Sequence, residues 1–185
     1  MKHFVWVGAL SFSLVLAALG FFPGESHAAS ASELERDARS ALKKLNGHSP
    51  AARSLAKRAT GILVFPSVVK AGLMIGGQFG EGVLFKNGKV AGYYNTAGAS
   101  YGLQAGAQQF GYAMLFMNDE ALAYLDSSDG FEVGAGPSVV MADDGLAKQS
   151  STATLTKDIY AFIFGQSGLM AGLGLQGNKI TKLDK

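Results

Sequence analysis

Glycine recurs at even spacing along the C-terminal two-thirds of this chain. The residues in these four runs are Gly72, Gly76, Gly80 and Gly82, then Gly98, Gly102 and Gly106, then Gly134 and Gly136, then Gly168, Gly172 and Gly174. Side chains alternate between the two faces of a strand, so residues two or four apart share a face. Glycine inside a strand is unfavourable unless another backbone or a ligand approaches closely, or the strand bends. The pattern therefore predicts a tightly curled antiparallel sheet, or a sheet whose bare face receives another element or a lipid-like ligand.

The face opposite the first glycine run is apolar. We expect this face to be the core side of the sheet, because it carries five large hydrophobic residues. Its residues are Leu73, Ile75, Phe79, Val83 and Phe85.

The N-terminus has the pattern of a signal peptide. Lys2 and His3 precede an almost wholly apolar run, Phe4 to Phe22, and Ser26-His27-Ala28 supplies small residues for cleavage. We expect cleavage after Ala28, with Ala31 as the second choice and an uncleaved anchor as the alternative. Residues 29–185 are then a single exported domain in the periplasm, on the outer-membrane surface or outside the cell. The absence of cysteine excludes disulfides and a lipid-bearing cysteine.

Helix signals come first in the mature chain and strand signals follow. Ser30 and Ser32 each precede a glutamate by three residues, which is the spacing of a capping box, and Ser49-Pro50 is typical of a second helix start. After Gly61 the residue pattern is typical of β-strands, and Asn87-Gly88 predicts a hairpin turn. The predicted strands are Ile62 to Phe65, then Lys70 to Lys86 as a long or bulged strand pair, Lys89 to Asn95, two in Ser100 to Met117, Phe131 to Met141, Thr152 to Phe164, Leu169 to Gln176, and Lys179 to Leu183.

One short helix, Ala121 to Leu125, is expected after Asn118, and a polar loop at Ala142 to Leu146. The predicted fold class is α+β: two N-terminal helices packed on a curled, glycine-rich antiparallel sheet or partial barrel, with one short internal helix.

Charge is distributed unevenly along the chain. From Ala38 to Gly80 there is no acidic residue, and the basic residues in this tract are Arg39, Lys43, Lys44, Arg53, Lys57, Arg58 and Lys70. Such a tract is either a solvated helical face or an anion-binding surface.

No catalytic or metal-binding constellation is evident. His48 is the single histidine after the signal and has no Gly-x-Ser-x-Gly elbow beside it. The glycines from Gly172 to Gly177 match a dinucleotide fingerprint by letters, but no helix or acidic residue can follow at the required distance before Lys185. We expect no enzymatic activity, no cofactor and no metal.

Four motifs resemble one known family. They are TGILVFPSVVKAGLMIGGQFGEGVLF at Thr60 to Phe85, SYGLQAGAQ at Ser100 to Gln108, VGAGPSVV at Val133 to Val140, and GLMAGLGLQGNKIT at Gly168 to Thr181. In this order they are similar to the SYLF domain family. The resemblance implies a module that binds phosphoinositides and other anionic lipids, whose yeast members also bind actin. It also implies that the N-terminal helical part and its basic residues contact lipid.

The chain departs from the eukaryotic pattern at Tyr94-Asn95-Thr96-Ala97, where relatives have Trp-Ser followed by proline. This departure and the predicted export argue against actin as a partner, and we expect no nucleic-acid partner. The favoured hypothesis is headgroup binding through the basic tract, with the glycine face as a place for an acyl chain. The alternative is an integral outer-membrane barrel of about eight strands or a structural envelope protein. The oligomeric state is not predicted.

Overall fold

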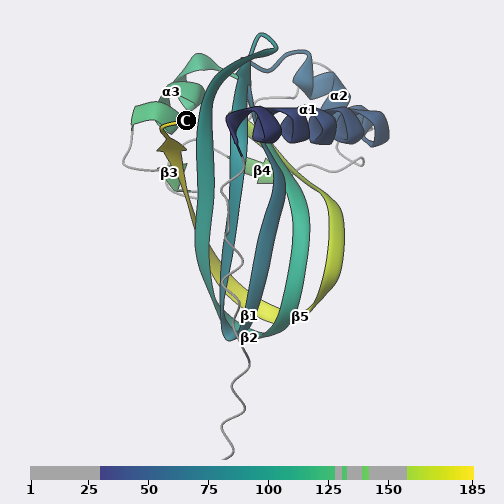
Figure 1. Ribbon diagram of the computed structural model, residues 1–185, viewed down its shortest axis with the longest axis vertical. Coiled ribbons are helices and arrows are strands. Elements are labelled where there is room, and N and C mark those ends of the chain that lie inside the picture. The colour runs from purple at the N-terminus through teal and green to yellow at the C-terminus, as the bar shows by residue number, and fades with distance from the viewer. Residues whose placement is uncertain (1–29, 128–130, 133–138, 142–157) are drawn as a thin grey trace, which may run out of the picture.

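The computed structural model describes residues 30–127, 131–132, 139–141 and 158–185 (Figure 1). The predicted signal peptide, the glycines Gly134 and Gly136, and the predicted loop at 142–146 lie outside the described residues. The elements in chain order are α1 (Ala31–His48), α2 (Pro50–Ala56), β1 (Gly61–Lys86), β2 (Lys89–Phe116), α3 (Asp119–Ser127), β3 (Phe131–Glu132), β4 (Val139–Met141) and β5 (Ile159–Leu183).

The described strands form one sheet of five, in the order β1-β2-β5-β3, with β4 also paired to β5. The long pairs β1–β2 and β2–β5 are antiparallel, as is β3–β5, whereas β4 runs parallel to β5. Over the described residues the sheet is not closed into a barrel. The predicted α+β class, with helices preceding a curled sheet, is confirmed.

The helix starts follow the sequence signals. The Ser30 hydroxyl oxygen accepts from the Glu33 backbone N–H at 3.3 Å, and Glu33 Oε2 accepts from the Ser30 backbone N–H at 3.1 Å. Ser30 is therefore the cap of α1, and its hydrogen bonds with the carboxylate lower the pKa of Glu33. Ser49 accepts from the Ala52 N–H at 3.1 Å and caps α2, which begins at Pro50. Among the described residues no helix is long and apolar enough to cross a bilayer.

The sequence predicts several separate strands where the structure has three long ones, and those predicted breaks are wrong. β1, β2 and β5 are continuous strands of 26, 28 and 25 residues. β1 runs through Pro66 with a register shift between Phe65 and Val68, a bulge that accommodates the missing N–H of proline. The hairpin turn at Asn87-Gly88 is confirmed, with φ of 51° and 74° at its two residues. Within these long strands, bulges are present at some of the positions where the sequence predicts breaks between shorter strands.

β1 doubles back on itself at its midpoint. Met74 has a φ of 64°, and a register shift separates Leu73 from Ile75. A Cβ placed on Gly80 would lie 2.7 Å from the Ser67 carbonyl oxygen, and one on Gly82 would lie 2.7 Å from the Val64 carbonyl oxygen. Since β2 stays paired with β1 along both halves, and β5 stays paired with β2, the whole sheet is folded into two facing layers, and the glycine face is the inside of the fold.

The predicted core face of β1 is only half correct. Val83 and Phe85 are buried, but Leu73, Ile75 and Phe79 are 74%, 68% and 54% exposed. Beyond the register shift between Phe65 and Val68, the odd-numbered side chains of β1 point out of the folded sheet, because the even-numbered glycine face points in. Helix α1 covers that outer face only near the helical end, where Val83 and Phe85 join its core cluster. The middle of β1 therefore carries uncovered apolar side chains.

The helices lie together at one end of the molecule, and the folded sheet extends away from them (Figure 1). One core cluster joins α1 and α2 to the sheet through Leu34, Leu45, Leu55, Val64 and Leu115. A second cluster joins α3 to the inside of the fold. Its residues include Leu63, Phe65, Leu84, Tyr94, Met114, Leu122, Leu125, Ile159 and Ile180.

A polar contact joins α3 to two strands. The buried Tyr94 of β2 donates its hydroxyl to Asp126 Oδ1 at 2.5 Å, and Lys182 of β5 donates to the same oxygen at 3.1 Å. Burial and the neighbouring Asp126 raise the pKa of Tyr94. Burial acts to raise the pKa of Asp126 too, but the hydrogen bonds from Tyr94 and Lys182 outweigh it and keep that pKa below the ordinary value.

Gly80 tests the fold of the sheet. Gly80→Ala should lower the free energy of unfolding by about 1–3 kcal/mol, because the new methyl group meets the backbone of the opposite layer. Gly77→Ala is the matched control, since its Cβ would lie 3.8 Å from the nearest atom, the Gly98 carbonyl oxygen. Urea unfolding of both variants measures the difference. Equal stabilities would contradict the close approach at Gly80.

Candidate anion-binding site

A pocket of about 560 Å³ lies between α1, the segment after α2, and the turn that joins β1 to β2. Its cationic residues are Arg39 and Lys43 from α1 and Lys57 from the C-terminal end of α2. Its floor is apolar, with Leu42, Ala56, Ala59, Ile62 and Phe85, and its remaining lining residues are Asn46, Asn87 and Gly88. Among the residues that the structure describes, no acidic one lines it. The pocket thus combines positive charge at its walls with a hydrophobic base.

Arg39 is held in place by three partners. Its guanidinium lies 4.7 Å from the centre of the Phe85 ring, Nη1 donates to the Gly88 carbonyl oxygen at 3.1 Å, and Nε donates to Glu35 Oε1 at 2.8 Å. The Glu35 pair follows from the four-residue spacing on α1. Arg39 therefore fastens α1 to the hairpin turn, and its charge is partly compensated before any ligand arrives.

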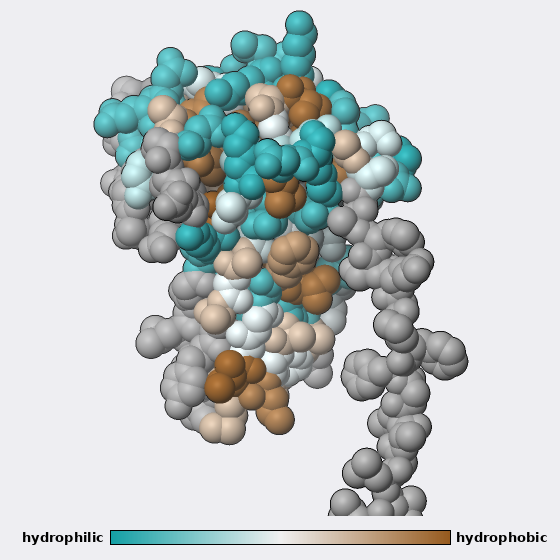
Figure 2. Space-filling model, turned by 60° about the vertical axis from the view of Figure 1, so that its left-hand side comes forward, coloured by the Kyte–Doolittle hydropathy of each residue, from teal (hydrophilic) through white to brown (hydrophobic). Residues whose placement is uncertain are grey.

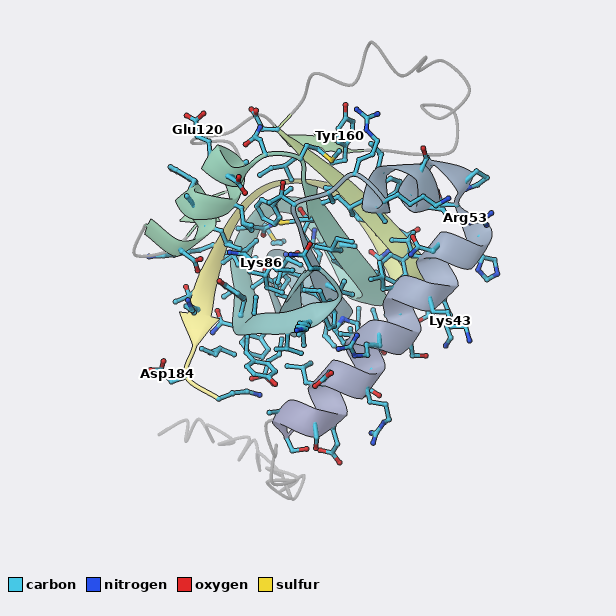
Figure 3. All side chains as sticks on the ribbon, turned by 90° about the horizontal axis from the view of Figure 1, so that it is seen from above. Lys43, Arg53, Lys86, Glu120, Tyr160 and Asp184 are labelled. Atoms are coloured by element: carbon cyan, nitrogen blue, oxygen red, sulfur yellow. The ribbon has the colours of Figure 1, made fainter. Side chains whose placement is uncertain are left out.

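Lys43 and Lys57 are exposed cations of the pocket, as Arg39 is. Lys43 follows Arg39 by one helical turn, so both residues face the hairpin turn. Figure 3 shows Lys43 on α1 and Arg53 near the junction of α1 with α2. Two flexible ammonium groups above an apolar floor suit a phosphate attached to a hydrophobic body.

The other basic residues of the predicted tract lie elsewhere. Lys44 lines a second pocket of about 430 Å³ with Asp37, Ser67 and Gln109. Arg58 is exposed after α2, and Lys70 lies in β1 beyond the helical end. Three of the seven predicted residues, Arg39, Lys43 and Lys57, are brought together in one site.

Arg53 has a role in the helical packing. Its Nε donates to the Asn46 carbonyl oxygen at 2.7 Å, and its Nη2 donates to the Gly47 carbonyl oxygen at 3.2 Å. These carbonyls belong to the last turn of α1, where the helix has no further N–H to bond them. His48 also bonds within this turn, its Nδ1 lying 2.8 Å from the Lys44 carbonyl oxygen.

The predicted glycine site is filled by protein where its surroundings are described. A Cβ on Gly72 would meet the Cα of Gly76, and one on Gly80 would meet Val68. These positions leave no room for an acyl chain. Gly106 has a φ of 132° and is exposed. Gly102 pairs with Gly174 and Gln104 with Gly172, and the surroundings of Gly102, Gly172 and Gly174 lie outside the described residues.

Residues 97–185 match the Ysc84 family model, described as "Las17-binding protein actin regulator". This is the SYLF family. Over these residues, just under half of the chain, the sequence is similar to this family, consistent with the resemblance of its motifs. The family is associated with lipids and with actin regulation. No curated protein matches the chain.

The candidate site lies in the half of the chain that precedes the matched residues. Sequence reasoning missed Asn46, Asn87, Gly88 and Phe85 as pocket residues, because a hairpin signal gives no information about which helix packs on the turn. One sequence signal for Phe85 was available: side chains alternate along the strand, and this places Phe85 on the same face as Val83. Among the described residues, no group of three His, Cys, Asp or Glu side chains is arranged to hold a metal.

Arg53 and Lys57 should differ in their effect on stability. Arg53→Ala should lower the free energy of unfolding by about 1 kcal/mol, because the last carbonyls of α1 lose their charged donor. Lys57→Ala should change it by less than about 0.5 kcal/mol, as expected for an exposed side chain. Thermal unfolding of the two variants side by side measures this. A larger loss at Lys57 than at Arg53 would contradict the assignment.

Proposed function

We propose that this protein is a non-enzymatic lipid-binding domain that holds an anionic phospholipid headgroup in the pocket between α1 and the β1–β2 turn. The observation that supports it is the lining of that pocket: Arg39, Lys43 and Lys57 around an apolar floor, without an acidic residue. Its volume lies in the range of small-molecule sites.

The phosphate would sit between Lys43 and Lys57, and the glycerol and first methylenes would rest on Leu42 and Ile62. Each lysine or arginine near an anionic lipid surface contributes about 1 kcal/mol to binding. Association would weaken with salt, since exposed charges are screened over about 8 Å at physiological ionic strength. The ligand class is phosphatidylglycerol, cardiolipin or a phosphoinositide, which share the phosphate and differ in what surrounds it.

We place the protein in the bacterial envelope. The support is the N-terminal pattern of Lys2-His3, the apolar run from Phe4 to Phe22, and the small residues up to Ala28. A periplasmic or surface position would bring the pocket to phosphatidylglycerol and cardiolipin. The actin function in the family's description is not part of the proposal, because an exported bacterial protein meets no actin in its own cell.

Replacing two lysines tests the site. Lys43→Gln with Lys57→Gln should weaken binding to phosphatidylglycerol vesicles roughly thirtyfold, which corresponds to about 2 kcal/mol for two charges. Lys44→Gln with Lys179→Gln removes the same charge from exposed positions outside the pocket and is the control.

The measurement is vesicle co-sedimentation of the exported form, recovered from the cell envelope with its N-terminus determined by mass spectrometry. Vesicles of phosphatidylcholine, phosphatidylglycerol, cardiolipin and phosphoinositide identify the preferred headgroup. Equal losses in the two double variants would show a general charge effect and reject the pocket as the binding site.

A further inference from the structure

The point where β1 doubles back carries three exposed aliphatic side chains. Leu73, Met74 and Ile75 are 74%, 57% and 68% exposed, and we refer to them as the apolar tip. Just behind them, Gly72 and Gly76 are in backbone contact, so the bend is narrow and held closed. Exposed aliphatic residues clustered at one turn differ from the scattered single ones that are normal on protein surfaces.

The part of the sheet behind the tip carries no charge. Register pairing places residues 71–80, 98–107 and 169–178 side by side as the distal lobe of the folded sheet. None of these residues is Asp, Glu, Lys, Arg or His. Charged groups are the main obstacle to entering a bilayer. The distal lobe therefore has no charged side chain that would oppose entry of the apolar tip into a bilayer.

The tip lies at the end of the molecule opposite the helices. Figure 1 shows the strands leaving the helical end and turning at the far end, and Figure 2 shows hydrophobic side chains at that far end and hydrophilic ones around the helices. The apolar tip and the cationic pocket are therefore separate surfaces.

We infer that the apolar tip is a second membrane-contact site, which inserts Leu73, Met74 and Ile75 into the acyl region of a lipid bilayer. A bilayer fits this surface better than a protein does. The three side chains protrude from a bend, offer no charge for specific pairing, and are far too few for the roughly 1,000 Å² of a stable protein interface. Insertion stops at the bend, because the open strand edges of the distal lobe have backbone groups that hydrocarbon cannot satisfy.

Since the two surfaces lie at opposite ends, a protein inserted by its tip presents the pocket away from that bilayer. If the pocket binds lipid as proposed above, the protein can join two membranes. The tip proposal stands without this consequence, because it requires no anionic lipid.

The absence of cysteine allows a single reporter at the tip. Ile75→Cys is labelled with an environment-sensitive fluorophore in the exported form and mixed with vesicles of phosphatidylcholine alone or of equimolar phosphatidylcholine and phosphatidylglycerol. We expect emission to shift to the blue on both vesicles and to be quenched by lipids that carry a quencher on the acyl chain. The same label at Ser54→Cys, an exposed position on α2, should show no acyl-chain quenching.

Polar substitution tests the tip independently. In the labelled protein, Leu73→Ser with Met74→Ser should weaken binding to phosphatidylcholine vesicles at least tenfold without changing the melting temperature. Val69→Ser with Ile163→Ser removes two exposed aliphatic side chains outside the tip, 52% and 43% exposed, and should change binding less than twofold.

Several outcomes would overturn the inference. An Ile75 label that stays water-like on vesicle-bound protein would do so, as would a lack of binding to either vesicle. A blue shift that grows with protein concentration without vesicles would identify a second copy as the occupant. Lys43→Gln with Lys57→Gln separates the two proposals: if this variant keeps the full gain in binding from phosphatidylcholine vesicles to equimolar phosphatidylcholine and phosphatidylglycerol vesicles, the pocket proposal fails, whereas an intact Ile75 signal keeps the tip proposal.

Discussion

The two halves of β1 face each other across glycine, and the rest of the structure depends on that contact. Gly82 lies against Phe65 and Gly80 against Ser67 and Val68, at distances that leave no space for a side chain. Because β2 remains paired with β1 along both halves, and β5 with β2, the contact folds three strands together. Without this contact, the sheet of long strands would expose both of its faces. With it, one face of the sheet is enclosed inside the fold.

Folding the sheet in this way creates two chemically different ends. At the helical end the strands meet the β1–β2 turn, and α1 packs across them with Arg39 over Phe85. At the other end the strands only turn, so the outward side chains of Leu73 and Ile75 have nothing to cover them. The cationic pocket and the apolar tip are consequences of one topology.

The sequence predicts local structure well where a short-range signal decides it. The caps Ser30, Ser49 and Asn118 and the turn at Asn87-Gly88 act over three or four residues, and each one is present. The continuity of the strands is not predicted correctly. The predicted strand Ile62 to Phe65 stops before Pro66, whereas β1 continues through Pro66 because a bulge accommodates it. The basic tract identified Arg39, Lys43 and Lys57, but spacing along the chain could not show that Arg53 instead bonds the end of α1. The exposure of Leu73 and Ile75 depends on a long-range fold, so alternation alone placed them in the core.

Proton NMR tests the folded sheet most directly. Gly82 and Phe65 lie 17 positions apart in the same strand, a separation that a straight strand would stretch to roughly 55 Å. The folded sheet predicts nuclear Overhauser contacts from the Gly82 Hα protons to the Phe65 ring and from Gly80 to the Val68 methyl groups. Cross-strand contacts between β1 and β2 serve as the internal reference. Their presence without the Gly82–Phe65 and Gly80–Val68 contacts would contradict the account.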